Sequence, residues 1–300
     1  MKNKSLIFAC FSLLAACTMS SCSNSNNGPV YKLIIAGMTD TAERRQSIDF
    51  SNPYYQSELV LVCKSSEGID SNKVYSESEV AEILDGKILI SQTGTVTDDM
   101  IEDVFVKKFN AIRANSVDSF TTASISVLNG QAFAFTAELP VAKAYVGGSE
   151  GQLTIMHIDE NILGEENLAS LGVSIGIKKG QSEFVSKLNE ALDAISNDAR
   201  NSIMEEMVSF NMNNNEAKDN IRSKLTGENG TIIIGLECNY PSFNWTEFEQ
   251  NNYTYNITGK STEFAEGYDV EIAYRIASYL GMTLEIEKME WDALLPWANI

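Results

Sequence analysis

Short apolar runs alternate with amphipathic helical patterns along almost the whole chain, and this alternation constrains the fold more than any other feature of the sequence. Runs typical of buried strands occur at residues 32–37, 58–63, 87–91, 132–136, 173–177, 231–235 and 283–287. Between them, apolar side chains recur on one helix face at Phe184, Leu188, Leu192 and Ile195, and again at Val270, Ala273, Ile276, Ala277 and Leu280. Strands that alternate with helices predict an α/β fold with mostly parallel sheets.

The N-terminus has the pattern of a lipoprotein signal peptide, which we assign to residues 1–22. Two lysines precede an apolar stretch, 5–16, that is too short to span a bilayer, because a spanning helix takes about 20 residues. Cys17 and Cys22 each end a lipobox-like site, and both are candidates for lipidation. Residues 23–30 are polar and predict a tether that holds the protein at the outer face of the cell membrane.

Composition and cysteine usage exclude several classes of function. The chain carries 22 basic and 41 acidic residues, a formal charge of −19, which argues against nucleic-acid binding because that depends on cationic contacts to phosphate. No glycine-rich nucleotide-binding motif follows a predicted strand. Cys63 and Cys238 make no disulfide framework, and the single histidine, His157, has neither metal-ligand spacing nor a nucleophile near it in sequence. We therefore expect no metal, no cofactor and no catalysis.

The segment from Ala36 to Arg44 is the most informative for binding. A buried strand ends at Gly37, where the backbone can approach a ligand closely because glycine has no Cβ. Thr41 is in position to cap a short helix that holds Arg44, so backbone N–H groups, a hydroxyl and a guanidinium converge. This set predicts a carboxylate receptor, while a capped helix with two solvated arginines is the other interpretation.

Three further elements place polar groups after predicted strands. Residues 92–97 open a helix whose first turn carries Asp98 and Asp99. Glu138 follows a strand at its carboxyl end, where ligands bind in such sheets, so its carboxylate is a candidate acceptor for an ammonium group. Residues 237–245 offer an acid, aromatic side chains and a proline turn. Each element alone is also explained by helix capping or core packing, but together they predict a receptor for an amino acid.

Four motifs resemble those of the amino-acid-binding subunits of ABC importers, the periplasmic-type solute-binding family 3. They are LIIAGMTDTAERRQSIDFSNPYY (33–55), GLECNYPSFNW (235–245), EGYDVEIAYRIASYLG (266–281) and MEWDALLP (289–296). The resemblance covers nearly all of residues 32–223 and 231–296. It implies a two-lobed type II periplasmic-binding-protein-like fold, with parallel-rich sheets flanked by helices and two hinge crossings. It also implies an amino acid ligand and docking on the membrane permease of an ABC importer, without a cofactor.

The resemblance also assigns roles by position. It implies a carboxylate-binding arginine at Arg44 supported by Gly37 and Thr39, second-lobe contacts at Thr95 and Thr97, an ammonium-binding acid at Glu138, and a side-chain pocket at Glu237, Tyr240 and Trp291. Glu138 is one methylene longer than the aspartate of many members, and Val96 stands where several members have threonine. An acid beside two aromatic residues favours a cationic side chain such as that of arginine or lysine, with glutamine or another polar amino acid still open.

The resemblance divides the chain into parts. It implies a first lobe built from residues 31–58, 169–210 and 231–300, a second lobe of residues 59–168, and crossing segments near Tyr54–Glu58 and Ala169–Val173. Closure of the lobes around the ligand is then expected to precede docking on the permease.

The order of these segments differs from that of the family, in which the block at 231–300 comes first and runs directly into the strand at 32–37. Here the block comes last, and the two parts together supply one nearly complete copy. A circular permutation, with the old ends joined through the asparagine-rich linker 211–230, is one interpretation. A rearranged or truncated piece of a tandem array is the other.

Other classes of function stay open at this stage. The same scaffold serves as the ligand-sensing domain of receptors, which need a transmembrane helix and a signalling module that we do not find in this sequence. It also hosts a few enzymes similar to cyclohexadienyl dehydratase, for which turnover of a prephenate-type acid is the discriminating assay. A non-functional recombination remnant is a further alternative.

Overall fold

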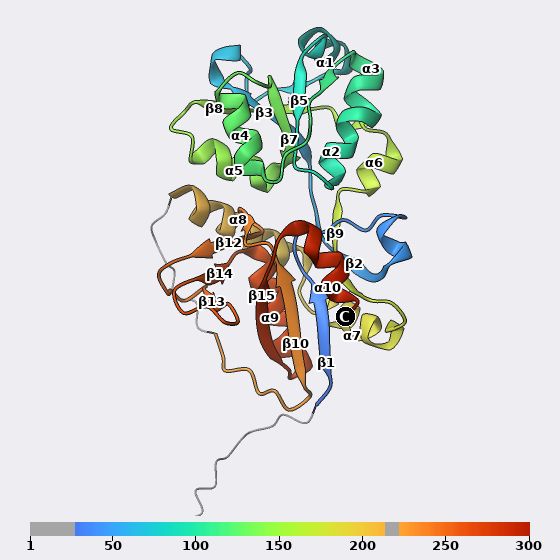
Figure 1. Cartoon of the computed structure of the whole chain (residues 1–300), viewed down its shortest axis with the longest axis vertical. Helices are drawn as coiled ribbons and strands as arrows, with labels where there is room; N and C mark the ends of the chain where they lie inside the picture. Colours follow the sequence, from blue (N-terminus) through green and yellow to red (C-terminus); the bar gives the residue numbers. More distant parts are fainter. Residues whose placement is uncertain (1–27, 214–221) are drawn as a thin grey trace, which may run out of the picture.

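The computed structural model describes residues 28–213 and 222–300. The predicted signal peptide, both candidate lipid cysteines and parts of the tether and linker therefore lie outside the described residues. Within these two ranges the chain forms two α/β lobes, each a mixed sheet flanked by helices (Figure 1). No helix in the described part of the chain is long and apolar enough to cross a membrane.

Lobe I is built on a five-stranded sheet and a smaller four-stranded sheet. The five-stranded sheet has the order β15 (Thr283–Lys288), β10 (Thr231–Leu236), β1 (Val30–Ile34), β9 (Gly172–Lys178) and β2 (Ile48–Gln56). The smaller sheet has the order β11 (Asn239–Tyr240), β12 (Asn244–Glu247), β14 (Phe264–Glu266) and β13 (Tyr255–Asn256). The helices of this lobe are η1 (Arg44–Gln46), α7 (Ser182–Asp193), α8 (Asn197–Asn213), α9 (Tyr268–Leu280), η5 (Trp291–Ala293) and α10 (Leu294–Ala298).

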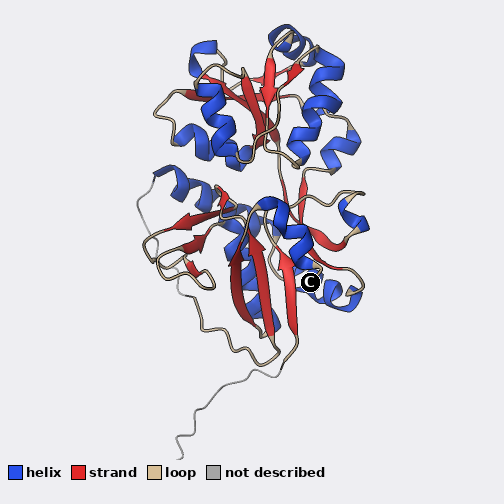
Figure 2. Ribbon diagram, in the orientation of Figure 1, coloured by secondary structure: helices blue, strands red, loops and turns tan. Residues whose placement is uncertain are grey.

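The centre of the lobe I sheet joins two segments of chain that are far apart in sequence. β1 pairs in parallel with β10 from Val30↔Thr231 to Ile34↔Gly235, and β10 pairs in parallel with β15. Figure 2 shows α10 in front of these strands and α9 behind them. A Cβ at Gly235 would lie 2.8 Å from the Trp297 ring, so glycine lets α10 approach β10 closely. Residues 231–300 therefore complete the same core that β1 begins.

A buried polar network fixes the start of α9 against the rest of lobe I. The Tyr54 hydroxyl donates to Asp269 Oδ1 at 2.6 Å and accepts from the Gly37 backbone N–H at 3.2 Å. The second carboxylate oxygen of Asp269 accepts from Asn244 Nδ2 at 2.8 Å. All four residues are buried. The network therefore ties β2, the loop after β1 and the C-terminal segment together around one carboxylate.

Lobe II is built on a six-stranded sheet. Its order is β4 (Val74–Tyr75), β8 (Leu153–Ile158), β3 (Leu59–Lys64), β7 (Ala134–Glu138), β5 (Ile88–Ile90) and β6 (Ile112–Arg113). Its helices are η2 (Ser65–Glu67), α1 (Glu77–Leu84), α2 (Val96–Met100), the π-helical segment η3 (Ile101–Val106), α3 (Lys107–Phe109), α4 (Phe120–Leu128), α5 (Leu139–Gly147), η4 (Glu160–Ile162) and α6 (Glu165–Ala169).

The position of strand β3, between helices on both faces of the sheet, explains why its sequence is apolar at every residue from Leu59 to Cys63. Its odd-numbered residues belong to a cluster with α1, α2 and η3, whereas Val60 and Val62 belong to the cluster that includes α4 and α5. Because successive side chains of a strand point to opposite faces, a strand covered by helices on both sides has no polar face. This second cluster continues into lobe I, so the two lobes share apolar packing.

Two connections link the lobes. β2 ends at Gln56 and β3 begins at Leu59, and the chain returns to lobe I at the start of β9. The two connections lie side by side, because Gln56 pairs with Gly172 and the Ser57 N–H donates to the Leu171 carbonyl at 3.2 Å. They form a narrow double crossing between two larger bodies, an arrangement suited to hinge motion.

The predicted α/β class is confirmed, and the seven predicted strands and two predicted helix faces all appear. The sheets are mixed, however, because β9, β3 and the strands beside them run antiparallel where the chain crosses and returns. The helix expected after Thr41 is only a single 3₁₀ turn, η1, whose N-cap residue is Glu43 rather than Thr41. The Thr41 hydroxyl accepts from the Arg44 N–H at 3.2 Å. The strands β2, β4, β6, β8 and β11 to β14 were not predicted, since their short or mixed patterns carry little periodic signal.

The Tyr54→Phe substitution should destabilise the protein by about 3 kcal/mol, because it removes one of the donors to the buried Asp269 carboxylate and the hydroxyl that accepts from the Gly37 N–H. Urea unfolding followed by circular dichroism measures this change. The matched control is Tyr279→Phe, because Tyr279 lies on the same helix as Asp269 and is 56% exposed. A Tyr54→Phe effect no larger than that of the control would show that this network does not contribute to the free energy of unfolding as expected.

Candidate functional site

A pocket lies between the two lobes, with about 290 Å³ of space between its walls, part of which is open to solvent. Lobe I contributes Gly37, Thr39, Arg44, Glu237, Tyr240 and Trp291, and lobe II contributes Gln92, Thr95, Val96, Phe120 and Glu138. These residues come from the loops after β1, β5 and β10, from the ends of β7 and β11, and from the first residues of η1, α2, α4 and η5. Several of these are carboxyl ends of strands, where ligands bind in α/β sheets.

The wall of the pocket in lobe I begins with Gly37, Thr39 and Arg44. Gly37 has a φ of +61°, and a Cβ at this position would lie 2.6 Å from the Tyr240 ring, so only glycine fits without strain. The guanidinium of Arg44 is anchored by donation from Nη1 to the Thr39 carbonyl at 2.7 Å. Thr39 in turn bridges Val173, at the start of the strand that returns from lobe II. The position of the guanidinium therefore depends on the hinge region.

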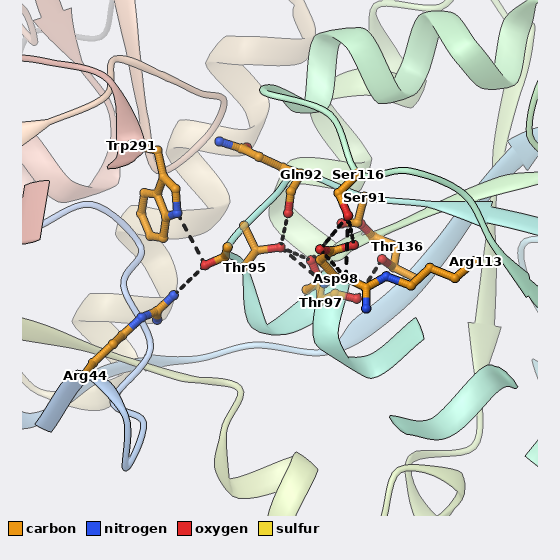
Figure 3. Close-up of polar contacts among 11 residues, drawn as sticks. Arg44, Ser91, Gln92, Thr95, Thr97, Asp98, Arg113, Ser116, Thr136 and Trp291 are labelled. Carbon is orange, nitrogen blue, oxygen red and sulfur yellow. Dashed lines mark hydrogen bonds and ion pairs between the residues drawn. The ribbon is translucent and has the colours of Figure 1, made fainter. Parts of the chain in front are cut away.

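Arg44 also reaches across the cleft to lobe II. Its Nη2 donates to the Gly94 carbonyl at 2.9 Å, and Trp291 Nε1 donates to the same oxygen at 3.3 Å; Figure 3 shows both side chains approaching it. The guanidinium lies 5.4 Å from the centroid of the Trp291 ring, within cation–π range. Burial lowers the pKa of Arg44, and the nearby Asp99 and Glu138 carboxylates oppose this shift. The arginine remains charged, because its pKa begins so far above neutrality.

Glu138 ends β7 and is buried against an aromatic wall. The Tyr240 hydroxyl donates to Glu138 Oε2 across the cleft. Burial raises the pKa of Glu138, whereas the bond from Tyr240 and the charge of Arg44 act in the opposite direction. The Tyr240 ring stacks on Phe120 at 5.4 Å and on Phe243 at 5.1 Å between centroids. These stacked rings fix the hydroxyl that contacts the acid.

Glu237 provides a second buried acid. Gln92 Nε2, from lobe II, donates to Glu237 Oε1 at 3.1 Å. Burial is the largest cause that raises the pKa of Glu237 to about 7, and the carboxylates of Glu290, Asp292 and Asp118 add to it. The hydrogen bond from Gln92 opposes the shift. A cation placed beside Glu237 would stabilise its ionised form.

The pocket therefore combines two acids and one guanidinium. Arg44 can bind a carboxylate, while Glu138 and Glu237 can each accept hydrogen bonds from a cationic group. Phe120 and Tyr240, whose rings stack on each other, line the same pocket as the two acids. This arrangement is complementary to a small zwitterion, above all one that carries an additional positive charge.

Eight of the nine residues predicted from the sequence line this pocket, and Thr97 does not. The Thr97 side chain is fully buried, with its hydroxyl 3.1 Å from Ser91 Oγ and 3.0 Å from Thr95 Oγ1. Sequence reasoning missed Gln92 and Phe120, and it noted Val96 only as a departure from the family. Gln92 lies directly after a predicted strand, and this position could have indicated a place in the pocket. No feature of the sequence around Phe120 indicates one. The ligand-binding roles of all these residues remain predictions.

No group of three or more metal-ligating side chains occurs among the described residues. His157 Nδ1 lies 2.7 Å from Glu58 Oε1, on the far side of β3 from the pocket lining. Cys63 and Cys238 are buried free thiols. In both thiols burial raises the pKa to about 12, which keeps them protonated and unreactive at neutral pH.

Comparison with known proteins gives a consistent set of similarities. Residues 26–207 match the family of bacterial extracellular solute-binding proteins, family 3. The chain is 26% identical over 170 residues to ABC transporter arginine-binding protein 1 of Escherichia coli, covering 56% of this chain and 62% of that protein. It is 28% identical over 170 residues to an L-arginine-binding protein of Pseudomonas aeruginosa, covering 54% and 58%. The chain thus spans about three fifths of the length of these two relatives.

Among solved structures, the chain is similar to an amino acid ABC transporter substrate-binding protein, AbpA, from Streptococcus pneumoniae bound to L-arginine. The TM-score is 0.49 and the sequence identity 22%, with 60% of this chain and 69% of that chain covered.

Glu237→Gln should raise the stability of the protein at pH 8 and leave it unchanged at pH 4. The folded pKa of about 7 lies above the usual value, so the stabilising contribution of the protonated acid is full below about pH 4.5 and is lost as pH rises through 7. A neutral glutamine escapes this loss, and we expect a gain of about 1–3 kcal/mol at pH 8.

Thermal unfolding at both pH values measures this difference. The matched control is Glu249→Gln, since Glu249 is exposed and lies outside the pocket. Equal melting temperatures of the Glu237→Gln variant and the unsubstituted chain at pH 8 would show that burial does not disfavour the ionised form of Glu237.

Proposed function

Because the chain belongs to the bacterial extracellular solute-binding proteins of family 3, we propose that it captures an amino acid outside the cytoplasm and delivers it to the permease of an ABC importer. The observation that carries this proposal is the convergence of Arg44, Glu138 and Glu237 on one pocket between two lobes. The family consists of solute-binding proteins rather than enzymes, and the pocket offers charged recognition groups rather than an activated nucleophile.

The proposed pose assigns one part of the ligand to each charged group. The ligand carboxylate binds Arg44, near the backbone of Gly37 and Thr39, in the place that the Gly94 carbonyl now takes at Nη2. The α-ammonium group donates to Glu138, whose partner Tyr240 then serves as a wall. The side chain of the ligand extends towards Glu237.

The charge balance favours a cationic amino acid. With both acids ionised, the pocket holds two negative charges and one positive charge, which a ligand with one carboxylate and two cationic groups neutralises. Trp291 and Tyr240 add aromatic faces that attract a cation. The arginine-binding names of the two relatives from Escherichia coli and Pseudomonas aeruginosa support this choice. Glutamine is the second candidate, because Gln92 and Glu237 can also pair with a neutral amide.

Ligand-gated closure is the proposed mechanism. Hydrogen bonds already join the lobes, including Ser242 Oγ to the Pro140 carbonyl at 3.1 Å and Gln92 to Glu237. A ligand that contacts both walls adds differential binding energy to the closed arrangement, so it shifts the population towards closure. Rotation about the paired connections at Ser57 and Leu171 would separate the lobes and admit the ligand.

We further propose that lipid on Cys17 or Cys22 anchors the protein at the extracytoplasmic face of the membrane. Metabolic labelling with palmitate that persists when both cysteines are replaced would contradict this.

We also propose that residues 231–300 form part of the same receptor in permuted order, since β10 lies between β15 and β1. The alternative is a fragment of a tandem array, in which case the chain would not melt cooperatively or respond to ligand.

Arginine should raise the melting temperature of the protein purified from Ser23 more than any neutral or acidic amino acid, because ligand at about 100 times its Kd adds about 2.7 kcal/mol.

The Arg44→Ala variant should lose about 2–5 kcal/mol of binding free energy in calorimetry, since a buried charge-assisted bond is removed. Arg45→Ala is the control, because Arg45 lies outside the pocket and pairs with Asp40. Affinity of Arg44→Ala within twofold of the unsubstituted chain would refute the carboxylate assignment.

The affinity for arginine should fall by up to about tenfold between pH 7.5 and pH 6, whereas the affinity for glutamine should change little. Below its pKa of about 7, Glu237 must release a proton before it can pair with a cation, so binding of a cation weakens as the pH falls. Both ligands engage Glu138 in the same way, which isolates the contribution of Glu237. Titration calorimetry at the two pH values tests this, and parallel pH profiles for the two ligands would contradict it.

A further inference from the structure

Four hydroxyl groups form a buried network beneath the lobe II wall of the pocket (Figure 3). Thr95 Oγ1 donates to the Gln92 carbonyl at 2.8 Å, Ser91 Oγ donates to the Thr136 carbonyl at 3.0 Å, and Thr136 Oγ1 donates to the Thr97 carbonyl at 2.9 Å. Ser91, Thr97 and Thr136 are fully buried, and only Thr95 reaches the pocket. The network therefore connects the ends of β5 and β7 to the start of α2.

The protons of this network can be assigned from its geometry. A carbonyl oxygen only accepts, so Thr95, Ser91 and Thr136 have each committed their single hydroxyl proton to a backbone carbonyl. Thr97 is the one hydroxyl of the four whose proton is not committed in this way. It lies 3.0 Å from Thr95 Oγ1 and 3.1 Å from Ser91 Oγ, so it can donate its one proton to either of these oxygens. Thr95 thus reaches the pocket with its proton directed away from any ligand.

The same network is connected to the acid of the pocket. Thr136 lies two residues before Glu138 on β7, so the two side chains share one face of the strand. The bond from Thr136 to the Thr97 backbone holds that face against the first turn of α2. On the outer side of the turn, Asp98 accepts from Arg113 at 2.7 Å and from Ser116 at 2.8 and 2.7 Å. The turn is therefore held from both sides.

From this geometry we infer that Thr97 is a positioning residue, whose buried hydroxyl holds the Thr95 loop and the Glu138 strand at the spacing that an amino acid requires. The inference rests on the proposed function, because it concerns the same ligand site. It also replaces the expectation that Thr97 contacts the ligand directly. Thr97 acts through Thr95 and Glu138, and its own side chain stays out of the pocket.

The test compares Thr97→Val, which keeps the shape and removes the donor, with Thr97→Ser, which keeps the donor. The Kd for arginine, measured by calorimetry well below the melting temperature, should rise about tenfold in Thr97→Val and stay within about twofold in Thr97→Ser. Thr154→Val is the matched control, since Thr154 lies on strand β8 of the same lobe outside the pocket. Its Kd should equal that of the unsubstituted chain.

A second measurement separates positioning from general destabilisation. In a Glu138→Gln background the Thr97→Val substitution should change the Kd by less than about twofold, because residues that act as one unit are not additive. Equal losses in Thr97→Val and Thr97→Ser, a change in Kd below twofold in Thr97→Val alone, or a tenfold effect that persists in the Glu138→Gln background would each overturn the inference.

The design remains decisive if one variant fails to fold. Ser91→Ala removes the acceptor at the other end of the Thr97 contact and should weaken arginine binding in the same direction; unchanged affinity in Ser91→Ala would overturn the inference. Failure of the unsubstituted chain to bind arginine or glutamine would instead overturn the proposed function, and with it this role for Thr97.

Discussion

The buried carboxylate of Asp269 is the point on which lobe I depends. Through the Tyr54 hydroxyl it fixes the Gly37 backbone, and through Asn244 it fixes the small sheet beside the pocket. Burial raises the pKa of Asp269 to about 7, so its ionisation is costly unless these donors stay in place. The interaction also joins residues more than 200 positions apart, which makes the C-terminal segment part of the same cooperative unit as β1 and β2.

The pocket carries a comparable free-energy cost, because it also buries ionisable acids. Glu237 and Glu138 are both buried acids with raised pKa values, and among the described residues the side-chain donor to each is a neutral group, Gln92 or Tyr240. In the proposed pose, a cationic amino acid would offset the desolvation of both acids at once, so groups that weaken the fold would strengthen binding. Such an opposition between stability and affinity is expected of a functional site.

Much of this organisation could be predicted from the chain alone. The uninterrupted apolar run of β3 and the apolar face of α9 depend on local periodicity, and both formed where the pattern indicated. Arg44, Glu138 and Tyr240 were placed by motifs at strand ends, and all three line one pocket. Gln92 and Phe120 escaped prediction, because their place in the site depends on how two lobes meet rather than on their neighbours in sequence.

The sequence by itself determined the order and type of the main elements and the chemical groups available for binding, since those follow from side-chain periodicity and from which residues end each strand. Only the tertiary structure decided which groups face the pocket. Thr95 and Thr97 look equivalent in sequence, yet one lines the pocket and the other is buried beneath it. That difference arises from hydrogen bonds to Ser91 and Thr136, whose positions are fixed by strand pairing across the lobe II sheet.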